Sequence, residues 1–160
     1  MNCMRVLFIA ASLATQATWA TDQVFVDFAL KNAHERGFMK CDAAIKEVFS
    51  NVGGKDMRVI TQTGLAADSM KMVAVYGVPG DAVYAEAEFR QSGAKCTYTR
   101  TSTIVSTKSC TAELGELPAF KYEAETVGVT FTKNAGGVNR ILLPVGSQGC
   151  ATVFLVNGEV

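Results

Sequence analysis

The sequence predicts an α+β protein, in which an N-terminal helical segment packs on an antiparallel β-meander sheet stapled by disulfides. Two observations support this prediction. Apolar residues recur with a helical period before Gly53 and with a period of two after Gly54. Widely spaced cysteines follow a leader-like start, as in exported disulfide-bonded chains. A helix followed by consecutive hairpins is typical of the α+β class.

The first 20 residues have the layout of a cleaved secretory signal peptide. A basic start at Arg5 precedes the apolar run Val6–Ala14, which is too short to span a bilayer. Small residues then lead to a cleavage site after Ala20. We therefore expect a signal peptide at 1–20, a single α+β domain at 21–160, and a periplasmic location.

The charge balance of the expected mature chain excludes some classes of partner. Cleavage leaves 140 of 160 residues and removes Arg5 but no acidic residue, so 14 basic residues face 15 acidic ones. A net charge of −1 offers no electrostatic argument for nucleic acid or for an anionic membrane surface. No later apolar stretch reaches the roughly 20 residues of a spanning helix, so we expect a soluble product without membrane insertion.

Two apolar stripes predict helices in the N-terminal part. Gly37, between the stripes, indicates either a kink or two short helices, and Gly53 suits a left-handed C-terminal cap. The first stripe comprises Phe25, Phe28, Ala29 and Ala33, and the second comprises Cys41, Ile45, Val48, Phe49 and Val52.

After Gly54 the chain reads as strands. The clearest alternation places Val83, Ala85, Ala87 and Phe89 on one face and Tyr84, Glu86, Glu88 and Arg90 on the other. The small alanines would let the helical segment approach the sheet closely. Further strands are expected at Met57–Thr61, Met70–Val78, Cys96–Ser106, Lys121–Lys133, Val138–Val145 and Ala151–Asn157.

Short turns separate these strands, as a meander requires. They are predicted at Pro79-Gly80-Asp81, at Ser92-Gly93 and at Asn134-Ala135-Gly136-Gly137. Ala151–Asn157 is expected as an exposed edge strand that could pair with itself, so both a monomer and a homodimer are open.

Removing the signal peptide discards Cys3 and leaves an even set of four cysteines, which predicts two disulfides. No two of them are close enough for a zinc site or a C-x-x-C redox pair, so we expect no metal. Three pairings are possible. We favour a local Cys96–Cys110 bridge together with Cys41–Cys150, which would tie the helix to the last hairpin.

The sequence gives no catalytic constellation and no cofactor motif, so we expect a protein that is not an enzyme. His34 is the only histidine, and oxidised cysteines offer no thiol nucleophile. The remaining enzymatic alternative is a small glycoside hydrolase that uses Glu86 and Glu88. Their Cα atoms would be about 6.5–7 Å apart on one strand face. The same spacing also occurs on any solvated sheet face.

A binding surface is the remaining interpretation. Tyr and Arg are enriched at protein interfaces, and the Ser147-Gln148 loop before Cys150 would be held rigid by a disulfide. The alternatives are an ordinary solvated face and an ordinary hairpin turn. The candidate partner-binding residues are Tyr84, Glu86, Glu88, Arg90, Tyr98 and Arg100 on the sheet, with Ser147 and Gln148 in the loop.

This layout resembles that of periplasmic inhibitor proteins, namely the immunity proteins that neutralise type VI secretion effectors and the periplasmic lysozyme inhibitors. The shared features are the signal peptide, a helix containing Cys41, a Thr-rich antiparallel sheet and four cysteines. The resemblance implies stoichiometric inhibition of a protein partner, a secreted peptidoglycan hydrolase. An adaptor or assembly protein of an envelope complex is the alternative.

Overall fold

The computed structural model describes residues 23–50, 52, 56–63, 66–78 and 81–160. The expected signal peptide and the Gly53 cap lie outside these residues. Within them, the helices are α1 (Gln23–Glu35), α2 (Asp42–Phe49) and α3 (Cys110–Glu116). The strands are β1 (Asp56–Thr63), β2 (Ser69–Val78), β3 (Asp81–Ser92), β4 (Lys95–Ser106), β5 (Lys121–Thr126), β6 (Val129–Lys133), β7 (Asn139–Val145) and β8 (Gly149–Glu159).

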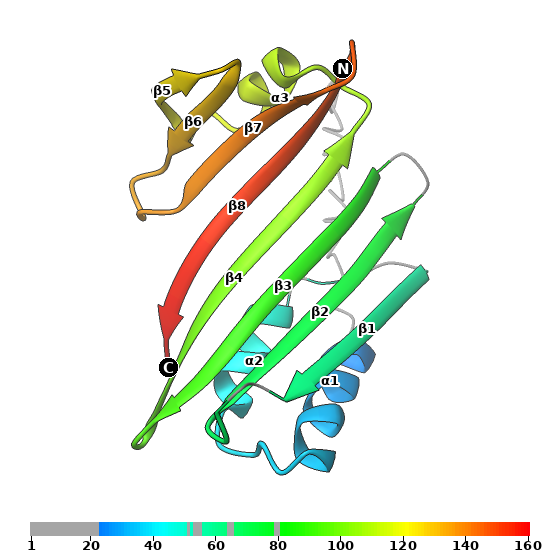
Figure 1. Cartoon of the computed structure of the whole chain (residues 1–160), viewed down its shortest axis with the longest axis vertical. Helices are drawn as coiled ribbons and strands as arrows, with labels where there is room; N and C mark the ends of the chain where they lie inside the picture. The colour runs from blue at the N-terminus through cyan, green and yellow to red at the C-terminus, as the bar shows by residue number, and fades with distance from the viewer. Residues whose placement is uncertain (1–22, 51, 53–55, 64–65, 79–80) are drawn as a thin grey trace, which may run out of the picture.

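All eight strands form one antiparallel sheet, in the order β1-β2-β3-β4-β8-β7-β6-β5. The predicted α+β class is confirmed, and α1 and α2 lie behind β1–β4 (Figure 1). The strand order differs from a simple meander, which would place β5 beside β4. Because β8 takes that position, Ala151–Asn157 lies inside the sheet, and its expected role as an edge strand is wrong. The sheet ends instead at β1 and β5.

The N-terminal segment forms two helices, and Gly37 lies between them with a φ of 76°. His34 at the end of α1 contacts Asp42 at the start of α2, with 2.8 Å between Nε2 and Oδ1. The second predicted stripe is entirely buried. In the first stripe Phe28 is exposed and Val26 is buried in its place.

An aromatic chain connects the helices to the sheet. Phe25 of α1 packs against Phe49 of α2 with 5.3 Å between ring centroids, and Phe49 packs against Phe89 of β3 at 6.1 Å. Small residues on the sheet make this approach possible, because Ala74, Ala85 and Ala87 are all buried there. The closeness predicted from the two β3 alanines is therefore confirmed.

The two disulfides form, but the favoured pairing is wrong. The bonds are Cys41–Cys96, which ties the start of α2 to β4, and Cys110–Cys150, which ties α3 to β8. Cys96 lies near the start of β4, and Cys110 follows its far end. Ten residues of strand span about 33 Å, whereas bridged Cα atoms are about 7 Å apart at most. The rigid strand between Cys96 and Cys110 prevents their bridging.

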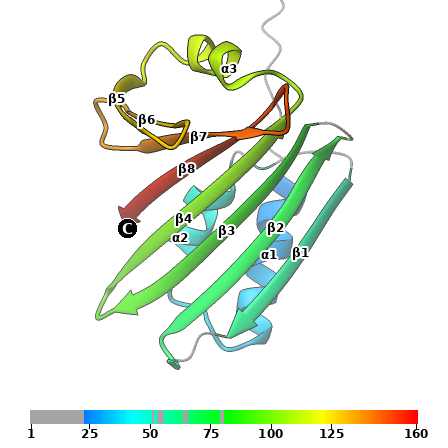
Figure 2. The ribbon, with the colours of Figure 1, turned by 45° about the horizontal axis from the view of Figure 1, so that its top comes forward.

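Two elements of the second half were not predicted. Helix α3 follows β4, with Ser109 Oγ accepting a hydrogen bond from the Ala112 amide at its start. The expected strand Lys121–Lys133 is a hairpin, whose turn contains Val127 and Gly128, both with positive φ. A β-branched residue rarely adopts this conformation, so the turn gave no sequence signal. Figure 2 shows α3 and the strands β5–β7 gathered at the end opposite α1 and α2.

Candidate functional site

One face of the sheet carries no helix among the described residues, and we call it the open face. The alternation of β3 places Tyr84, Glu86, Glu88 and Arg90 there, since Ala85, Ala87 and Phe89 point to the helices. Residues opposite each other on antiparallel strands share a face. Figure 1 looks onto this side. The register adds Lys71, Val73 and Val75 of β2, Thr97, Thr99, Thr101, Thr103 and Val105 of β4, and Val153 and Leu155 of β8.

A small polar network lies at the centre of the open face. Glu86 accepts a hydrogen bond from the Tyr84 hydroxyl at 2.6 Å and pairs with Lys71 Nζ at 2.5 Å. These contacts stabilise the charged carboxylate, Lys71 foremost, and lower the pKa of Glu86. The hydrogen bond to Glu86 likewise raises the pKa of Tyr84. Glu88 lies 3.5 Å from Arg90 Nη2. All four of the predicted polar residues on β3, namely Tyr84, Glu86, Glu88 and Arg90, therefore interact with partners on the same face.

Exposed hydrophobic side chains lie beside this network. Tyr84 is 40% exposed, and Val75, directly opposite on β2, is 44% exposed. Val105 on β4 and Leu155 on β8 are also exposed on this face, with the threonines of β4 between Leu155 and Tyr84. Scattered exposed apolar residues are normal on a protein surface, but a contiguous group with a polar rim is typical of an interaction site. Tyr84 and Val75, directly opposite each other and bordered by Lys71, Glu86 and the threonines of β4, have this character.

The structure does not place Tyr98 and Arg100 on the open face, so that part of the prediction is wrong. They lie opposite Phe89 and Ala87, on the face that the helices cover. Tyr98 is buried, and its hydroxyl donates to Glu47 at 2.7 Å. Burial, with this hydrogen bond second, raises the pKa of Tyr98 to about 12.

Arg100 also holds α2 against the sheet. Its Nη1 donates to the carbonyl of Val48 at 2.9 Å, and its Nε donates to the Ser102 hydroxyl at 2.9 Å. A backbone carbonyl in the last turn of a helix has no partner within the helix. Arg100 and Tyr98 are therefore structural residues that attach α2 to β4.

The Ser147-Gln148 loop is exposed at one end of the sheet, between β7 and β8. Cys150 beside it is bridged, as the prediction required, although its partner is Cys110. The register puts this loop beside Ser106, seven residues along β4 from the partner of Glu88. That separation is about 23 Å. The loop is therefore far from Glu88, but it lies only three residues of β4, about 10 Å, from the level of Tyr84.

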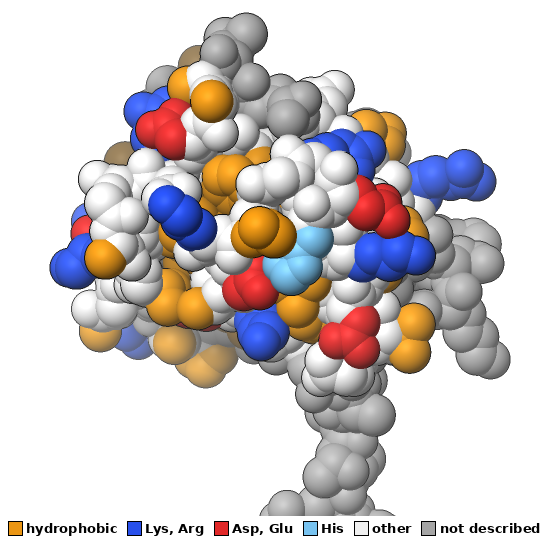
Figure 3. All heavy atoms as spheres, turned by 90° about the horizontal axis from the view of Figure 1, so that it is seen from below, with side chains coloured by type: hydrophobic (Ala, Val, Ile, Leu, Met, Phe, Trp, Pro, Cys, Tyr) orange, Lys and Arg blue, Asp and Glu red, His pale blue; other side chains and the backbone are white. Residues whose placement is uncertain are grey.

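Surface charges are mixed where the structure shows them. At the end of the molecule seen in Figure 3, acidic and basic side chains are interspersed among hydrophobic ones. Mixed charge gives no single-sign field that would attract a polyanion. Within the described part of the chain, no group of three His, Cys, Asp or Glu side chains is placed to hold a metal ion.

Sequence reasoning missed one residue of unusual chemistry, Arg140 on β7. Its side chain is completely buried, and its guanidinium carbon lies 5.7 Å from the centroid of Phe120 and 5.9 Å from that of Phe154. Burial lowers the pKa of Arg140, against the opposing effect of Glu113 and Glu116. The only available signal was its alternation with Ile141 and Leu143, which gives no indication of which face is buried.

Comparison with protein-family models, with curated proteins and with solved structures finds no match to this chain. None of the helices among the described residues has the length and apolar character needed to cross a membrane. The two disulfides are typical of proteins from oxidising compartments.

Proposed function

We propose that this protein is a periplasmic binding protein that inhibits a secreted peptidoglycan hydrolase stoichiometrically, as an immunity protein does. The observation that carries the proposal is the open face, where Tyr84 and Val75 lie exposed among charged side chains. Aromatic residues within a polar rim are the usual centres of protein interfaces. The two disulfides favour an exported protein, and the layout of the chain resembles periplasmic inhibitors.

The rigidity of the open face supports an inhibitor. Its residues stand on strands that are paired on both sides, since β2, β3, β4 and β8 are all interior strands. The Cys41–Cys96 bond and the aromatic core fix the opposite side. A surface that is already ordered loses little conformational entropy on binding, and this favours tight complexes.

The surroundings of Glu86 and Glu88 do not suit the hydrolase alternative. A general acid at neutral pH needs a raised pKa, whereas Lys71 and Tyr84 lower the pKa of Glu86. Glu86 and Glu88 also stand on one strand of a broad sheet face, whereas the acids of glycosidases flank the bond that they cleave. Carboxylates held by neighbouring donors are better suited to fixing a binding surface.

The test is a titration of purified hydrolases with the oxidised protein. Muramidases, amidases and endopeptidases that act on peptidoglycan are each mixed with increasing protein, and the clearing of cell-wall suspensions is followed. We expect one class to lose all activity at a ratio of one to one. Val75→Glu, a charge placed directly opposite Tyr84, should weaken inhibition by at least about tenfold. Val24→Glu, the same change at an exposed position of α1, should leave it unaltered.

The outcomes separate the proposal from its alternatives. Loss of inhibition in a Ser147→Ala/Gln148→Ala variant, with Val75→Glu still active, would move the interface to the loop. If none of the three enzyme classes is inhibited, the inhibitor proposal fails. If the Glu86→Gln/Glu88→Gln variant acts on cell-wall suspensions in the same way as the wild type, the hydrolase alternative is excluded. A partner that binds the open face without loss of any enzymatic activity would favour the adaptor alternative.

A further inference from the structure

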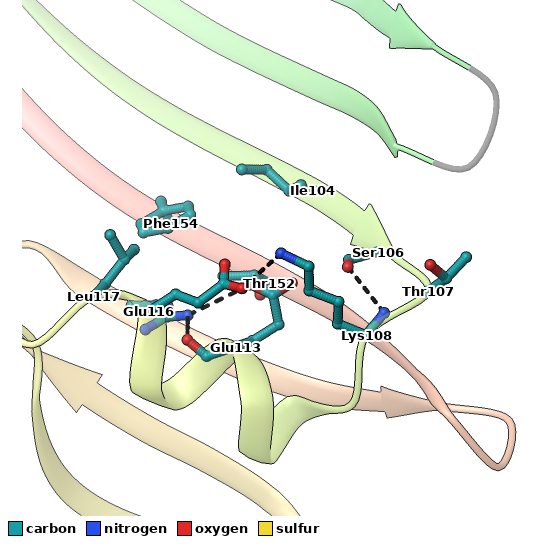
Figure 4. Close-up of a pocket in the computed structure, with 10 residues that line it drawn as sticks. Ile104, Ser106, Thr107, Lys108, Glu113, Glu116, Leu117, Thr152 and Phe154 are labelled. Atoms are coloured by element: carbon teal, nitrogen blue, oxygen red, sulfur yellow. Dashed lines mark hydrogen bonds and ion pairs between the residues drawn. The ribbon is translucent and has the colours of Figure 1, made fainter.

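A cavity of about 410 Å³ lies between α3 and the sheet, on the face opposite the open face (Figure 4). Its size falls in the range of ligand pockets, roughly 300–1,000 Å³. Three secondary-structure groups form its walls, namely β4, α3 and the β7–β8 pair. The lining residues that matter below are Ile104, Lys108, Leu117, Arg140, Thr152 and Phe154.

Arg140 contributes a buried charge to this cavity. Its Nη2 donates to the backbone carbonyl of Glu113 at 2.6 Å and lies 3.9 Å from the Glu113 carboxylate. No described residue accepts a hydrogen bond from Nε or Nη1. These two nitrogens carry three of the five guanidinium N–H groups. A buried cation with unused donors is unfavourable unless further acceptors reach it.

Thr152 adds an independent observation in the same cavity. Its hydroxyl is buried, and it also has no hydrogen-bond partner among the described residues. Thr152 lies opposite Leu142, diagonally across from Arg140 on the same face of the sheet. Buried hydroxyls are nearly always hydrogen-bonded in folded proteins. Two neighbouring donors without partners in one cavity indicate a missing acceptor.

The other side chains that line the cavity indicate what kind of molecule would supply the missing acceptor. Ile104, Leu117 and Phe154 give the cavity an apolar side. Lys108 forms an ion pair with Glu116 at 2.6 Å, and Glu113 lies beside Arg140, so the acidic and basic side chains balance. A balanced site accepts a single negative charge more readily than a double one.

We propose that this cavity binds a small organic carboxylate, whose carboxylate accepts hydrogen bonds from Arg140 and Thr152 and whose apolar body lies against Ile104, Leu117 and Phe154. A carboxylate offers four acceptor positions, enough for both groups of donors. Hydrogen bonds from a guanidinium to a carboxylate are also among the stronger ones in proteins. The site is independent of the proposed inhibitor function, since it lies on the other face of the sheet.

The probes are benzoate and hexanoate, titrated into the oxidised protein and followed by amide NMR shifts. Benzamide tests the need for charge, and inorganic phosphate tests the need for an apolar body. We expect shifts at residues of α3 and β8 with both carboxylates at about 10 mM, sufficient to detect millimolar affinity. Benzamide and phosphate should bind at least about tenfold more weakly.

Two variants link binding to the named donors. Thr152→Val removes a hydroxyl without a partner, so it should weaken benzoate binding while leaving thermal stability equal or higher. Arg140→Met should abolish binding. Thr103→Val, the same change on the open face, should alter neither property.

Several results would overturn the proposal. These are the lack of any shift with both carboxylates in the folded wild type, equal binding of phosphate or benzamide, and unchanged affinity in Thr152→Val. If Arg140→Met fails to fold, the Thr152→Val variant alone tests the proposal, because it removes only a hydroxyl that has no partner among the described residues. Lower stability together with unchanged binding in Thr152→Val would assign the hydroxyl to structure and would also refute the site.

Discussion

Gly158 on β8 lies directly opposite Tyr98 on β4, and replacing it with alanine should disrupt the attachment of α2. A Cβ at position 158 would lie 2.5 Å from Cε1 of Tyr98 and closer still to Cζ and the hydroxyl oxygen. Carbon atoms normally approach to about 3.5–4.0 Å, so the ring must move by about 1 Å or more. Tyr98 is buried and hydrogen-bonded to Glu47, so it cannot turn aside freely.

The expected loss of stability in Gly158→Ala follows from the contacts that this movement of the ring breaks. A hydrogen bond to a charged carboxylate contributes about 1.5–3 kcal/mol, and overpacking a core costs about 1–3 kcal/mol. Since both costs arise from one displacement, we expect Gly158→Ala to lower the free energy of unfolding by about 2–4 kcal/mol. Urea unfolding followed by circular dichroism measures it.

A double-mutant cycle tests the stated cause. In a Tyr98→Val background the ring is absent, so Gly158→Ala should cost less than about 0.5 kcal/mol. Gly115→Ala in α3 is the matched control, because its added Cβ meets nothing within 4 Å. This change should raise stability by about 0.5–1 kcal/mol. A Gly158→Ala protein as stable as the wild type, or one equally destabilised in both backgrounds, would refute the reasoning.

Three further predictions follow from the structure. Replacing Cys110 and Cys150 with alanine opens a link across 40 positions, so calorimetry should show the free energy of unfolding falling by about 4 kcal/mol, and a loss below about 1 kcal/mol would contradict it. The folded pKa of Tyr98, about 12, exceeds the unfolded value of about 10. Urea unfolding should therefore show stability that is complete below pH 10 and declines as the pH rises towards 12, with a smaller decline in Tyr98→Phe. Val127→Asn removes a β-branched residue with a φ of 54°. The free energy of unfolding should rise by about 1 kcal/mol, and the melting temperature should rise with it. An unchanged melting temperature would show that the turn is unstrained.

Local patterns predicted the elements whose residues interact with near neighbours. The stripe from Cys41 to Val52 is buried, and the alternation of Val83–Phe89 matches β3. The turn predicted at Asn134–Gly137 joins β6 to β7, with the Gly137 amide donating to the carbonyl of Asn134. These features depend on a repeat period or on turn chemistry, and both are properties of a short sequence window.

The error at Tyr98 and Arg100 was avoidable. Gly93 and Ala94 form a two-residue turn, which pairs Ser92 with Lys95 and so fixes every later pair. That register puts the threonines of β4, not Tyr98, beside Glu88. Similarly, the predicted strand after Cys96 was already too long for a bridge to Cys110.

Other features depend on contacts between distant parts of the chain. The pairing of β4 with β8 joins segments separated by more than 40 positions, and no local signal reports it. Arg140 belongs to the same class, because an arginine in an alternating strand is usually exposed. Its burial depends on α3 and on Phe154, neither of which neighbours it in sequence.

The pairing of β8 with β4 also determines the order in which this sheet can assemble. The first four strands, their two helices and the Cys41–Cys96 bond need nothing beyond β4. Strands β5, β6 and β7 can form hairpins with one another, but within the sheet they are joined to that first unit only by the pairing of β8 with β4. Since pairing between distant segments is slow, we expect β8 docking to be the late step of folding. The Cys110–Cys150 bond would then form only after β8 has docked.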